Sequence, residues 1–317
     1  MKTDNGGQQK LVPENELIDF APHWFKEALA KPMTTRRAAF RGAEVNFKEW
    51  PKPHDDAPGI VFLHGDSAHS HWFDFVAPLL AEEFHIIAPD MPGMGDSGWL
   101  DAYSRDIMAE GVIAAARAAG FTRKPALVAH SFGGMIGLIA ASRHADELAA
   151  LLLCDFLVRP PETHVEWYTD FTGRPTRIYP TLDDNLKRFR LTPEQPCANQ
   201  FILDHIARHS VREAEGGWTW KFDPSIYVGF TIGNDLPDIF SNLTCPLAVM
   251  CGELSTSDGK ISERRKAVDY MRGLRTDIPF YDIPEAHHHI MLDRPHAFAA
   301  AVAAQMAVWR ANGAFAD

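Results

Sequence analysis

The sequence predicts an α/β protein with a mostly parallel central sheet flanked by helices, and the alternation of two kinds of segment carries this prediction. Short apolar runs typical of fully buried strands occur at residues 59–63, 84–90, 126–129 and 151–154. Segments with helical character follow three of them, at residues 72–83, 104–119 and 135–141. Strands that alternate with helices in this way form βαβ units, and the strands of such units pair in parallel.

Length, charge and cysteine content narrow the class of protein. A chain of 317 residues has room for one large α/β domain with an insertion, or for two small domains. Its formal net charge of −11 argues against nucleic acids and anionic membranes as partners. No apolar run approaches the roughly 18 residues of a membrane span, and residues 1–7 lack the apolar core of a signal peptide. The four cysteines have no Cys-x-x-Cys spacing, which favours a cytoplasmic location.

The chain divides into three predicted parts. Residues 1–35 form an N-terminal extension, in which residues 14–30 have the pattern of an amphipathic helix. Residues 36–158 and 241–317 form the α/β core, which we expect to begin with a hairpin that turns at Arg41-Gly42-Ala43. The helix of the extension is expected to pack either on the inserted segment or on a second subunit, and the second alternative would make a homo-oligomer.

Residues 159–240 are predicted to be a helical lid inserted into the core. The tandem prolines Pro160 and Pro161 end the preceding pattern, because proline cannot continue a helix or a central strand. The segment that follows is rich in aromatic residues and turns, and it has no pattern of parallel strands. Trp218 and Trp220 are candidates for the wall of a pocket, with packing inside the lid as the alternative.

The most informative segment is the turn that carries Ser131. The apolar run 126–129 enters it, and a helix built of small and aliphatic residues leaves it. A serine between such elements sits in a strained turn that exposes its hydroxyl at the carboxyl edge of the sheet, as in the nucleophile elbow Gly-x-Ser-x-Gly. Ala129 stands at the first glycine of that motif and Gly133 at the second. The alternative is a Ser-Gly turn that only connects a strand to a helix.

Four motifs in a fixed order extend this interpretation. A strand ends in His64-Gly65, the run Asp90–Ser97 has the form Asp-x-x-Gly-x-Gly-x-Ser, the serine elbow follows, and a histidine cluster lies near the carboxyl terminus. With these motifs the chain resembles the α/β-hydrolase fold superfamily over residues 36–309. The resemblance implies a nucleophile, an acid and a histidine in that chain order, with the histidine in a loop after the last strand.

The histidine cluster supplies the expected base. Relatives often have an acidic residue and a proline shortly after the catalytic histidine, and counting back from Asp293-Arg294-Pro295 selects His288. His287 is the alternative, because neighbouring side chains diverge and only one of the cluster should face Ser131. Consecutive histidines rarely converge on one ion, so we expect no metal there and no cofactor for the reaction.

The acid is less obvious. Many relatives carry Gly-x-x-Asp after the penultimate strand, whereas Gly252–Ser255 places a serine at that position. Asp155 ends an apolar strand and is the favoured acid, because burying an ionisable side chain there is costly unless it is paired, as it would be with His288. This segment resembles haloalkane dehalogenases and some lactonases, which carry their acid after the same strand. Glu253 is the reserve acid, Asp258 is a further local candidate, and capping a turn is the alternative role for Asp155.

Stabilisation of the transition state is assigned to two backbone N–H groups. These belong to Phe132, which follows the nucleophile, and to Asp66, which follows His64-Gly65. His64 itself is expected to close this loop and not to react. His69, His71 and Trp72, just beyond the loop, either line the pocket or begin a helix.

Besides the cluster at residues 287–289, a histidine pair in the inserted segment has a spacing typical of metal sites. His205 and His209 lie four residues apart beside Asp204 and would share one face of a helix. The pattern contains no third ligand, so we interpret these residues as a solvated face of the lid.

Together these residues predict a cofactor-free serine hydrolase of the carboxylic ester hydrolase or lactonase type. Ser131 attacks an acyl carbon with His288 as base, and water hydrolyses the acyl-enzyme. Serine at the elbow argues against dehalogenase and epoxide-hydrolase chemistry, for which this superfamily uses aspartate. The aromatic lid favours a small apolar ester or lactone, and residues 90–94 resemble those of hydrolases that open macrolactones such as zearalenone. Hydrolysis of a C–C bond or a thioester on the same triad, and a low-turnover ligand receptor of the same fold, are the alternatives.

Overall fold

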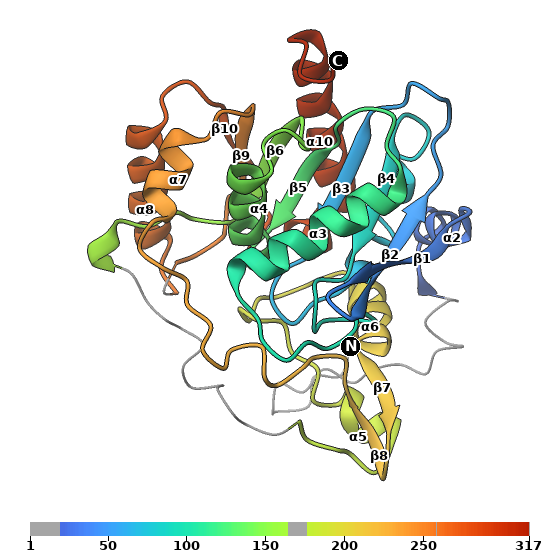
Figure 1. Ribbon diagram of the computed structural model, residues 1–317. Coiled ribbons are helices and arrows are strands. Elements are labelled where there is room, and N and C mark those ends of the chain that lie inside the picture. The colour runs from blue at the N-terminus through green and yellow to red at the C-terminus, as the bar shows by residue number, and fades with distance from the viewer. Residues whose placement is uncertain (1–19, 164–175, 258, 317) are drawn as a thin grey trace.

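One sheet of eight strands forms the centre of the protein (Figure 1). The computed structural model describes residues 20–163, 176–257 and 259–316. The strands lie in the spatial order β1-β2-β4-β3-β5-β6-β9-β10, with the bounds β1 (Thr34–Phe40), β2 (Ala43–Trp50), β3 (Gly59–Leu63), β4 (His85–Pro89), β5 (Ala126–His130), β6 (Ala150–Cys154), β9 (Leu247–Gly252) and β10 (Phe280–Ile283). β2 pairs antiparallel with β1 and with β4, and every other neighbouring pair in the sheet is parallel. The predicted mostly parallel sheet is confirmed.

The first two strands form the predicted hairpin. Arg41 and Gly42 make its turn and have φ angles of 49° and 80°. Positive φ at both central residues is the conformation that a two-residue hairpin turn favours, because it matches the twist of the two strands.

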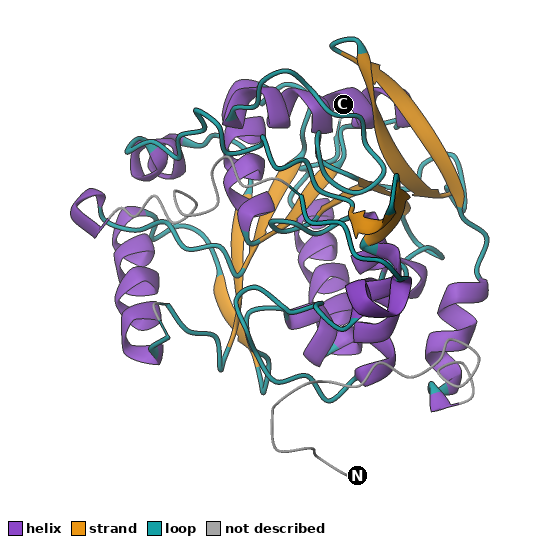
Figure 2. Cartoon of the chain, turned by 90° about the horizontal axis from the view of Figure 1, so that it is seen from below, coloured by secondary structure: helices purple, strands orange, loops and turns teal. Residues whose placement is uncertain are grey.

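Helices cover both faces of the sheet. One face is covered by α3 (Arg105–Ala119), α4 (Phe132–Arg143) and α8 (Ile261–Leu274), and the other by α10 (Pro295–Ala311). Figure 2, which views the chain from below, shows helices on both sides of the strands. Along β3, Val61 and Leu63 pack toward α3 and α4, whereas Ile60 and Phe62 pack toward α10. Every residue of β3, β4, β5 and β6 is buried, as expected for strands covered on both faces.

Two short helical elements lie at the carboxyl edge of the sheet. They are η3 (Pro161–Thr163), which leads into the inserted segment, and α9 (Ile290–Asp293), which follows the histidine cluster. None of the helices in the described ranges combines the length and the apolar character that a membrane crossing requires.

The predicted helix over residues 72–83 is wrong. Two short 3₁₀ turns, η1 (Ser70–Phe73) and η2 (Ala77–Leu79), stand in its place. Pro78 explains the difference, because it has no N–H to donate within a continuous helix. η1 positions side chains directly after the loop that follows β3.

The described part of the inserted segment contains less helix than predicted. It holds α5 (Leu182–Leu186), α6 (Gln200–His209) and an antiparallel hairpin of β7 (Val211–Ala214) and β8 (Gly217–Trp220). The prediction misses this hairpin, although its two-residue turn contains Gly216, which has a φ of 85°. α7 (Leu236–Asn242) crosses the predicted end of the segment at residue 240 and packs on α4 and α8 of the core. In Figure 1, α5, α6, β7 and β8 gather below the carboxyl ends of the strands.

The N-terminal extension packs on the inserted segment. Its described helix, α2 (His23–Ala30), begins after Pro22, whereas the predicted helix begins at residue 14. The residues before position 20 lie outside the described part of the chain. The ring of Phe25 on α2 is buried and lies 4.9 Å from the ring of Phe201 on α6. The apolar face of α2 is therefore covered, at least in part, by α6.

Close packing at the start of α4 depends on glycine. A Cβ atom on Gly133 would lie 2.3 Å from the carbonyl oxygen of His64 and 2.9 Å from that of Leu63. These are backbone atoms of the loop after β3, so a side chain at position 133 would displace that loop. Gly273 offers a contrast, because it lies within α8 and no atom lies within 4 Å of the place where its Cβ would stand.

We predict opposite effects of alanine at these two helical glycines. Gly133→Ala should lower the free energy of unfolding by about 1–3 kcal/mol, because the methyl group overpacks the site. Gly273→Ala should raise it by about 1 kcal/mol, because alanine has the higher helix propensity. Urea unfolding of both variants beside the wild type measures the two changes, and equal effects would contradict the steric account.

Candidate active site

Ser131 occupies a sharp turn between β5 and α4. Its backbone has a φ of 53° and a ψ of −125°, values that residues other than glycine rarely adopt. Its N–H donates a hydrogen bond over 3.0 Å to the carbonyl oxygen of Cys154, which fixes the turn to the neighbouring strand β6. The side chain lines a cavity at the carboxyl edge of the sheet.

His288 reaches Ser131 from the loop after β10. Its Nε2 lies 2.8 Å from Ser131 Oγ, and its Nδ1 lies 3.2 Å from Asp155 Oδ1. His130 holds this loop in place, because its Nε2–H donates over 2.9 Å to the carbonyl oxygen of His288. Burial lowers the pKa of His130 to about 3, so its imidazole is neutral and suits this structural contact. A hydroxyl, an imidazole and a carboxylate thus form one hydrogen-bonded chain.

Asp155 follows β6 in a left-handed backbone conformation, with a φ of 47°. Only 2% of its side chain is exposed. Oδ2 accepts the N–H of Gly252 over 2.7 Å, and Oδ1 accepts the hydroxyl of Ser255 over 2.7 Å in addition to the contact with His288. These donors replace the hydration that a buried carboxylate loses.

Ser255 is a residue of the site that sequence reasoning missed. It stands at the position where many related hydrolases carry their acid, and here it donates a hydrogen bond to Asp155. β6 and β9 are neighbouring parallel strands in which Cys154 pairs with Met250, so the residues after both strands meet at one edge of the sheet. The sequence contains a signal for this contact, because Asp155 follows the strand β6 and Ser255 follows the strand β9.

The reserve residues lie elsewhere. Glu253 Oε2 accepts the N–H of Glu285 over 2.9 Å, and the Glu253 side chain is exposed. His287 Nδ1 lies 3.0 Å from Asp293 Oδ2, so this imidazole is engaged away from Ser131. The further acid candidate at position 258 lies outside the described residues.

The cavity beside Ser131 has a volume of about 400 Å³, which is within the usual range for small-molecule sites. Its walls are largely apolar and come from both the core and the inserted segment, with the apolar members Phe132, Met135, Phe156, Leu157, Pro161, Pro193, Ile232, Leu236 and Pro237. Arg159 also lines it, and its guanidinium donates to Ser257 Oγ over 2.8 Å.

The five residues expected as pocket candidates do not belong to this lining. His69 is buried, and its Nε2 lies 2.8 Å from Ser210 Oγ. Trp72 packs beside the ring of His289, with 5.1 Å between the ring centroids. Trp218 and Trp220 pack against a small cluster around α5, α6 and β7. Sequence composition could not separate an aromatic pocket wall from the aromatic interior of the inserted segment.

Asp66 and Phe132 both line the cavity beside Ser131. Phe132 is the first residue of α4, and Asp66 lies in the loop after β3. His64 shapes this loop, because its Nδ1–H donates to the carbonyl oxygen of Gly65 over 2.8 Å and its Nε2 accepts the N–H of Met91 over 3.0 Å. These contacts agree with the structural role expected for His64.

The side chain of Asp66 is paired with Tyr227, a second residue that sequence reasoning missed. The Tyr227 hydroxyl donates to Asp66 Oδ1, and the Ser67 hydroxyl donates to Oδ2 over 3.1 Å. Burial in the cavity wall raises the pKa of Asp66, although both hydroxyl donors oppose the change. Tyr227 lies 161 residues further along the chain, and no local pattern connects the two.

The parallel sheet, the turn at Ser131 and the order in which Ser131, Asp155 and His288 follow along the chain define an α/β hydrolase. A model of the alpha/beta hydrolase family matches residues 60–301, which is well over half of the chain. The chain therefore belongs to the alpha/beta hydrolase family.

Two curated esterases and one solved structure illustrate its relatives. The chain is 24% identical to the esterase Rv0045c of Mycobacterium tuberculosis over 251 residues, which cover 76% of this chain and 80% of that protein. It is 26% identical to the pimeloyl-acyl-carrier-protein methyl ester esterase of Chromobacterium violaceum, over 78% of this chain and 93% of that protein. The thioesterase domain from the curacin biosynthetic pathway shares the fold, with a TM-score of 0.70 and 19% identity over 86% of this chain and 99% of that one. The two esterases support a hydrolase activity of the esterase type.

The pairing of Asp66 predicts a pH-dependent effect on stability. A carboxyl group whose pKa is higher in the folded than in the unfolded protein holds more protons when folded, so its ionisation destabilises the fold as the pH rises above about 4. Asp66→Asn removes this titration and keeps an acceptor for Tyr227. We predict that the free energy of unfolding of the variant increases relative to the wild type between pH 4 and pH 8.

Urea unfolding at several pH values across this window measures the difference. Asp101→Asn, at an exposed carboxylate, serves as the matched control and should show no such trend. A difference between Asp66→Asn and the wild type that stays constant with pH would contradict the raised pKa.

Proposed function

We propose that the protein is a serine hydrolase that cleaves an uncharged carboxylic ester or lactone through an acyl-enzyme. The observation that carries this proposal is the chain of hydrogen bonds from the Ser131 hydroxyl through His288 to Asp155, beside a largely apolar cavity. A serine hydroxyl is a poor nucleophile until a base accepts its proton, and this chain supplies both a base and a group that orients it.

The proposed reaction has two halves. His288 Nε2 accepts the proton of Ser131 as Oγ attacks the acyl carbon, and the imidazolium then donates this proton to the leaving alkoxide as the C–O bond breaks. In the second half, His288 takes a proton from the water that attacks the acyl carbon, and it returns this proton to Ser131 Oγ as the acyl–Oγ bond breaks and the carboxylic acid leaves. Asp155 keeps the Nδ1–H of His288 in place and stabilises the imidazolium in both halves.

We assign stabilisation of the oxyanion to the backbone N–H groups of Phe132 and Asp66. Both residues lie beside Ser131 in the cavity lining, which supports the assignment. Loss of one such donor typically costs roughly 3–4 kcal/mol of transition-state stabilisation. The Asp66 side chain is engaged on both oxygens by the hydroxyls of Tyr227 and Ser67, which hold it beside the proposed oxyanion site.

The walls of the cavity support an uncharged and largely apolar substrate. Pro193, Ile232 and Leu236 bring the inserted segment into the wall, so we propose that this segment acts as a lid that shapes the pocket. Arg159, whose guanidinium donates to Ser257 Oγ, keeps its positive charge and adds a polar group to a wall that is otherwise largely apolar. Within this class our finer proposal is a macrolactone of the zearalenone type, which rests on the resemblance of residues 90–94 and on an acid placed after β6.

A substrate panel with a serine variant tests the proposal. Proton release is followed with short esters, long esters and macrocyclic lactones, for the wild type and for Ser131→Ala. We expect turnover of at least one class by the wild type and a loss in kcat on the order of 10⁶-fold in the variant. A folded wild type that turns over no member of the panel would contradict the proposal and favour hydrolysis of C–C bonds or a receptor role.

Moving the acid tests the role of Asp155. Asp155→Asn should lower kcat about 10⁴-fold, because His288 loses the group that holds its tautomer, whereas the matched variant Glu253→Gln should leave kcat unchanged. Ser255 Oγ lies 2.7 Å from Asp155 Oδ1, so Asp155→Asn combined with Ser255→Asp returns a carboxylate to the same place. The double variant should recover roughly tenfold or more of the lost kcat. Full activity in Asp155→Asn and loss in Glu253→Gln would assign the acid to Glu253.

A further inference from the structure

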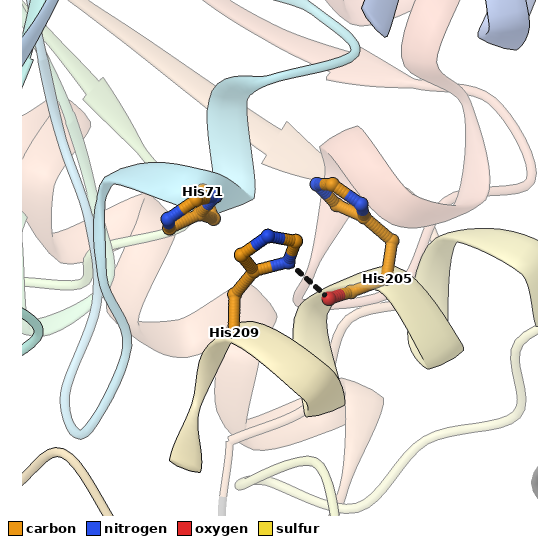
Figure 3. A group of neighbouring side chains, drawn as sticks. All are labelled: His71, His205 and His209. Carbon is orange, nitrogen blue, oxygen red and sulfur yellow. Dashed lines mark hydrogen bonds between the residues drawn. The ribbon is translucent and has the colours of Figure 1, made fainter. Parts of the chain in front are cut away.

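Three histidines from two distant parts of the chain meet outside the active site (Figure 3). His71 lies on η1 of the core, and His205 and His209 lie one turn apart on α6 of the inserted segment. One ring nitrogen from each imidazole belongs to a group in which all three nitrogens lie within 4.8 Å of one another. The rings of His71 and His209 stack with their centroids 3.8 Å apart. The interpretation of the α6 pair as a solvated face is therefore wrong, because His71 packs against it and completes a set of three.

We propose that these three imidazoles bind one divalent transition-metal ion of the zinc class, and that the ion joins α6 to the core. Imidazole nitrogens bind zinc at about 2.0–2.1 Å in a tetrahedral arrangement, with water able to fill a fourth position. Ligand nitrogens in such a site lie roughly 3.3 Å apart. Binding therefore requires side-chain rotations that close the present spacing and turn the stacked rings of His71 and His209 toward one ion.

The outer nitrogen of each imidazole is already held, which is how proteins orient histidines that bind metals. His71 Nδ1 lies 2.7 Å and His205 Nε2 lies 2.9 Å from the same oxygen, Asp74 Oδ2. His209 Nδ1–H donates over 2.8 Å to the carbonyl oxygen of His205 (Figure 3). His71 Nε2, His205 Nδ1 and His209 Nε2 are left without a hydrogen-bond partner among the described residues, and these are the proposed ligands.

The charged pair Lys48 and Asp74 contacts the cluster. Lys48 Nζ lies 2.6 Å from Asp74 Oδ1 and 2.7 Å from His71 Nδ1. Zinc on His71 Nε2 selects the tautomer with its hydrogen on Nδ1, directed at Asp74 Oδ2. This tautomer ends the contact in which Lys48 Nζ donates to Nδ1, so Lys48 keeps its bond to Asp74 Oδ1. The charges of Lys48 and Asp74 cancel, so the pair adds no net charge beside the ion, and the three imidazoles are its protein ligands.

A metal at this place would strengthen a contact that the fold already makes. His69, two residues before His71, reaches Ser210 directly after α6, with 2.8 Å between Nε2 and Oγ. The ion would add a second link between the same two elements. An ion that binds only the folded protein stabilises it by mass action, so the stability of the fold becomes dependent on zinc concentration.

Zinc binding to the full chain tests the proposal. Protein stripped with a chelator is titrated with zinc alone, and binding is followed by equilibrium dialysis and by thermal unfolding. We expect one ion at this cluster and a rise in Tm of about 4 °C at a zinc concentration one hundred times Kd. Loss of an outer partner costs roughly 10–100-fold in metal affinity, so His71→Gln and His209→Gln, which remove ligands, should each raise Kd by at least about 100-fold.

Two further histidine variants serve as matched controls. His54→Gln changes an exposed histidine and should leave the response unchanged. His288→Gln removes a member of a second histidine group with ligand spacing among the described residues, which contains His130, His288 and His289, and it should also retain the response. Zinc binding that is lost in His288→Gln and kept in His209→Gln, or a wild type whose Tm ignores zinc, would overturn the proposal.

The wild type alone provides a test that does not depend on the folding of any variant. Cobalt(II) replaces zinc in sites of this kind and shifts the proton signals of its ligands in nuclear magnetic resonance spectra. Three exchangeable imidazole N–H signals should move, because the outer N–H of each ligand is hydrogen-bonded to an oxygen. Fewer than three shifted signals would contradict ligation by all three histidines.

Discussion

The buried carboxylate of Asp155 is the constraint on which the rest of the candidate active site depends. It follows β6 and accepts hydrogen bonds from Gly252 of β9, from Ser255 beyond it, and from His288 in the loop after β10. A buried charge without such donors would cost several kcal/mol, so the carboxylate draws three segments into one unit. The 2.8 Å contact between His288 and Ser131 is a consequence, because Ser131 is itself bonded to the end of β6 through Cys154.

Much of this arrangement could be predicted because it depends on local signals and on strand order. Ser131 stands between an apolar strand and a helix of small residues, and Asp155 ends the next strand, so a parallel sheet brings both to its carboxyl edge. The hydrogen bond from Ser255 could not be predicted in the same way. It requires the pairing of β6 with β9, and nearly one hundred residues separate Asp155 from Ser255 along the chain.

Two further features that sequence reasoning missed are contacts between the core and the inserted segment. Tyr227 meets Asp66, and His71 meets His205 and His209, across separations well beyond one hundred residues. Residue type and spacing describe one element at a time, so a pair of histidines on α6 looks incomplete until η1 is placed against it. The position of His71 was also hidden by the wrong helix prediction, because η1 stands where the periodicity predicts a regular helix that Pro78 prevents.

The loop between β3 and η1 physically connects the candidate active site with the proposed zinc site. At one end Asp66 lines the cavity, and at the other end Asp90 Oδ1 accepts the N–H of Ser70 over 2.5 Å. His69, next to Ser70, reaches across to Ser210 at the end of α6. Moving α6 away from η1 would break this buried contact, and each buried group left without its partner costs about 1–3 kcal/mol. The wall of the cavity at Asp66 is therefore held from the core side and from the inserted segment at once, and the packing of α6 on η1 is part of what keeps the pocket in shape.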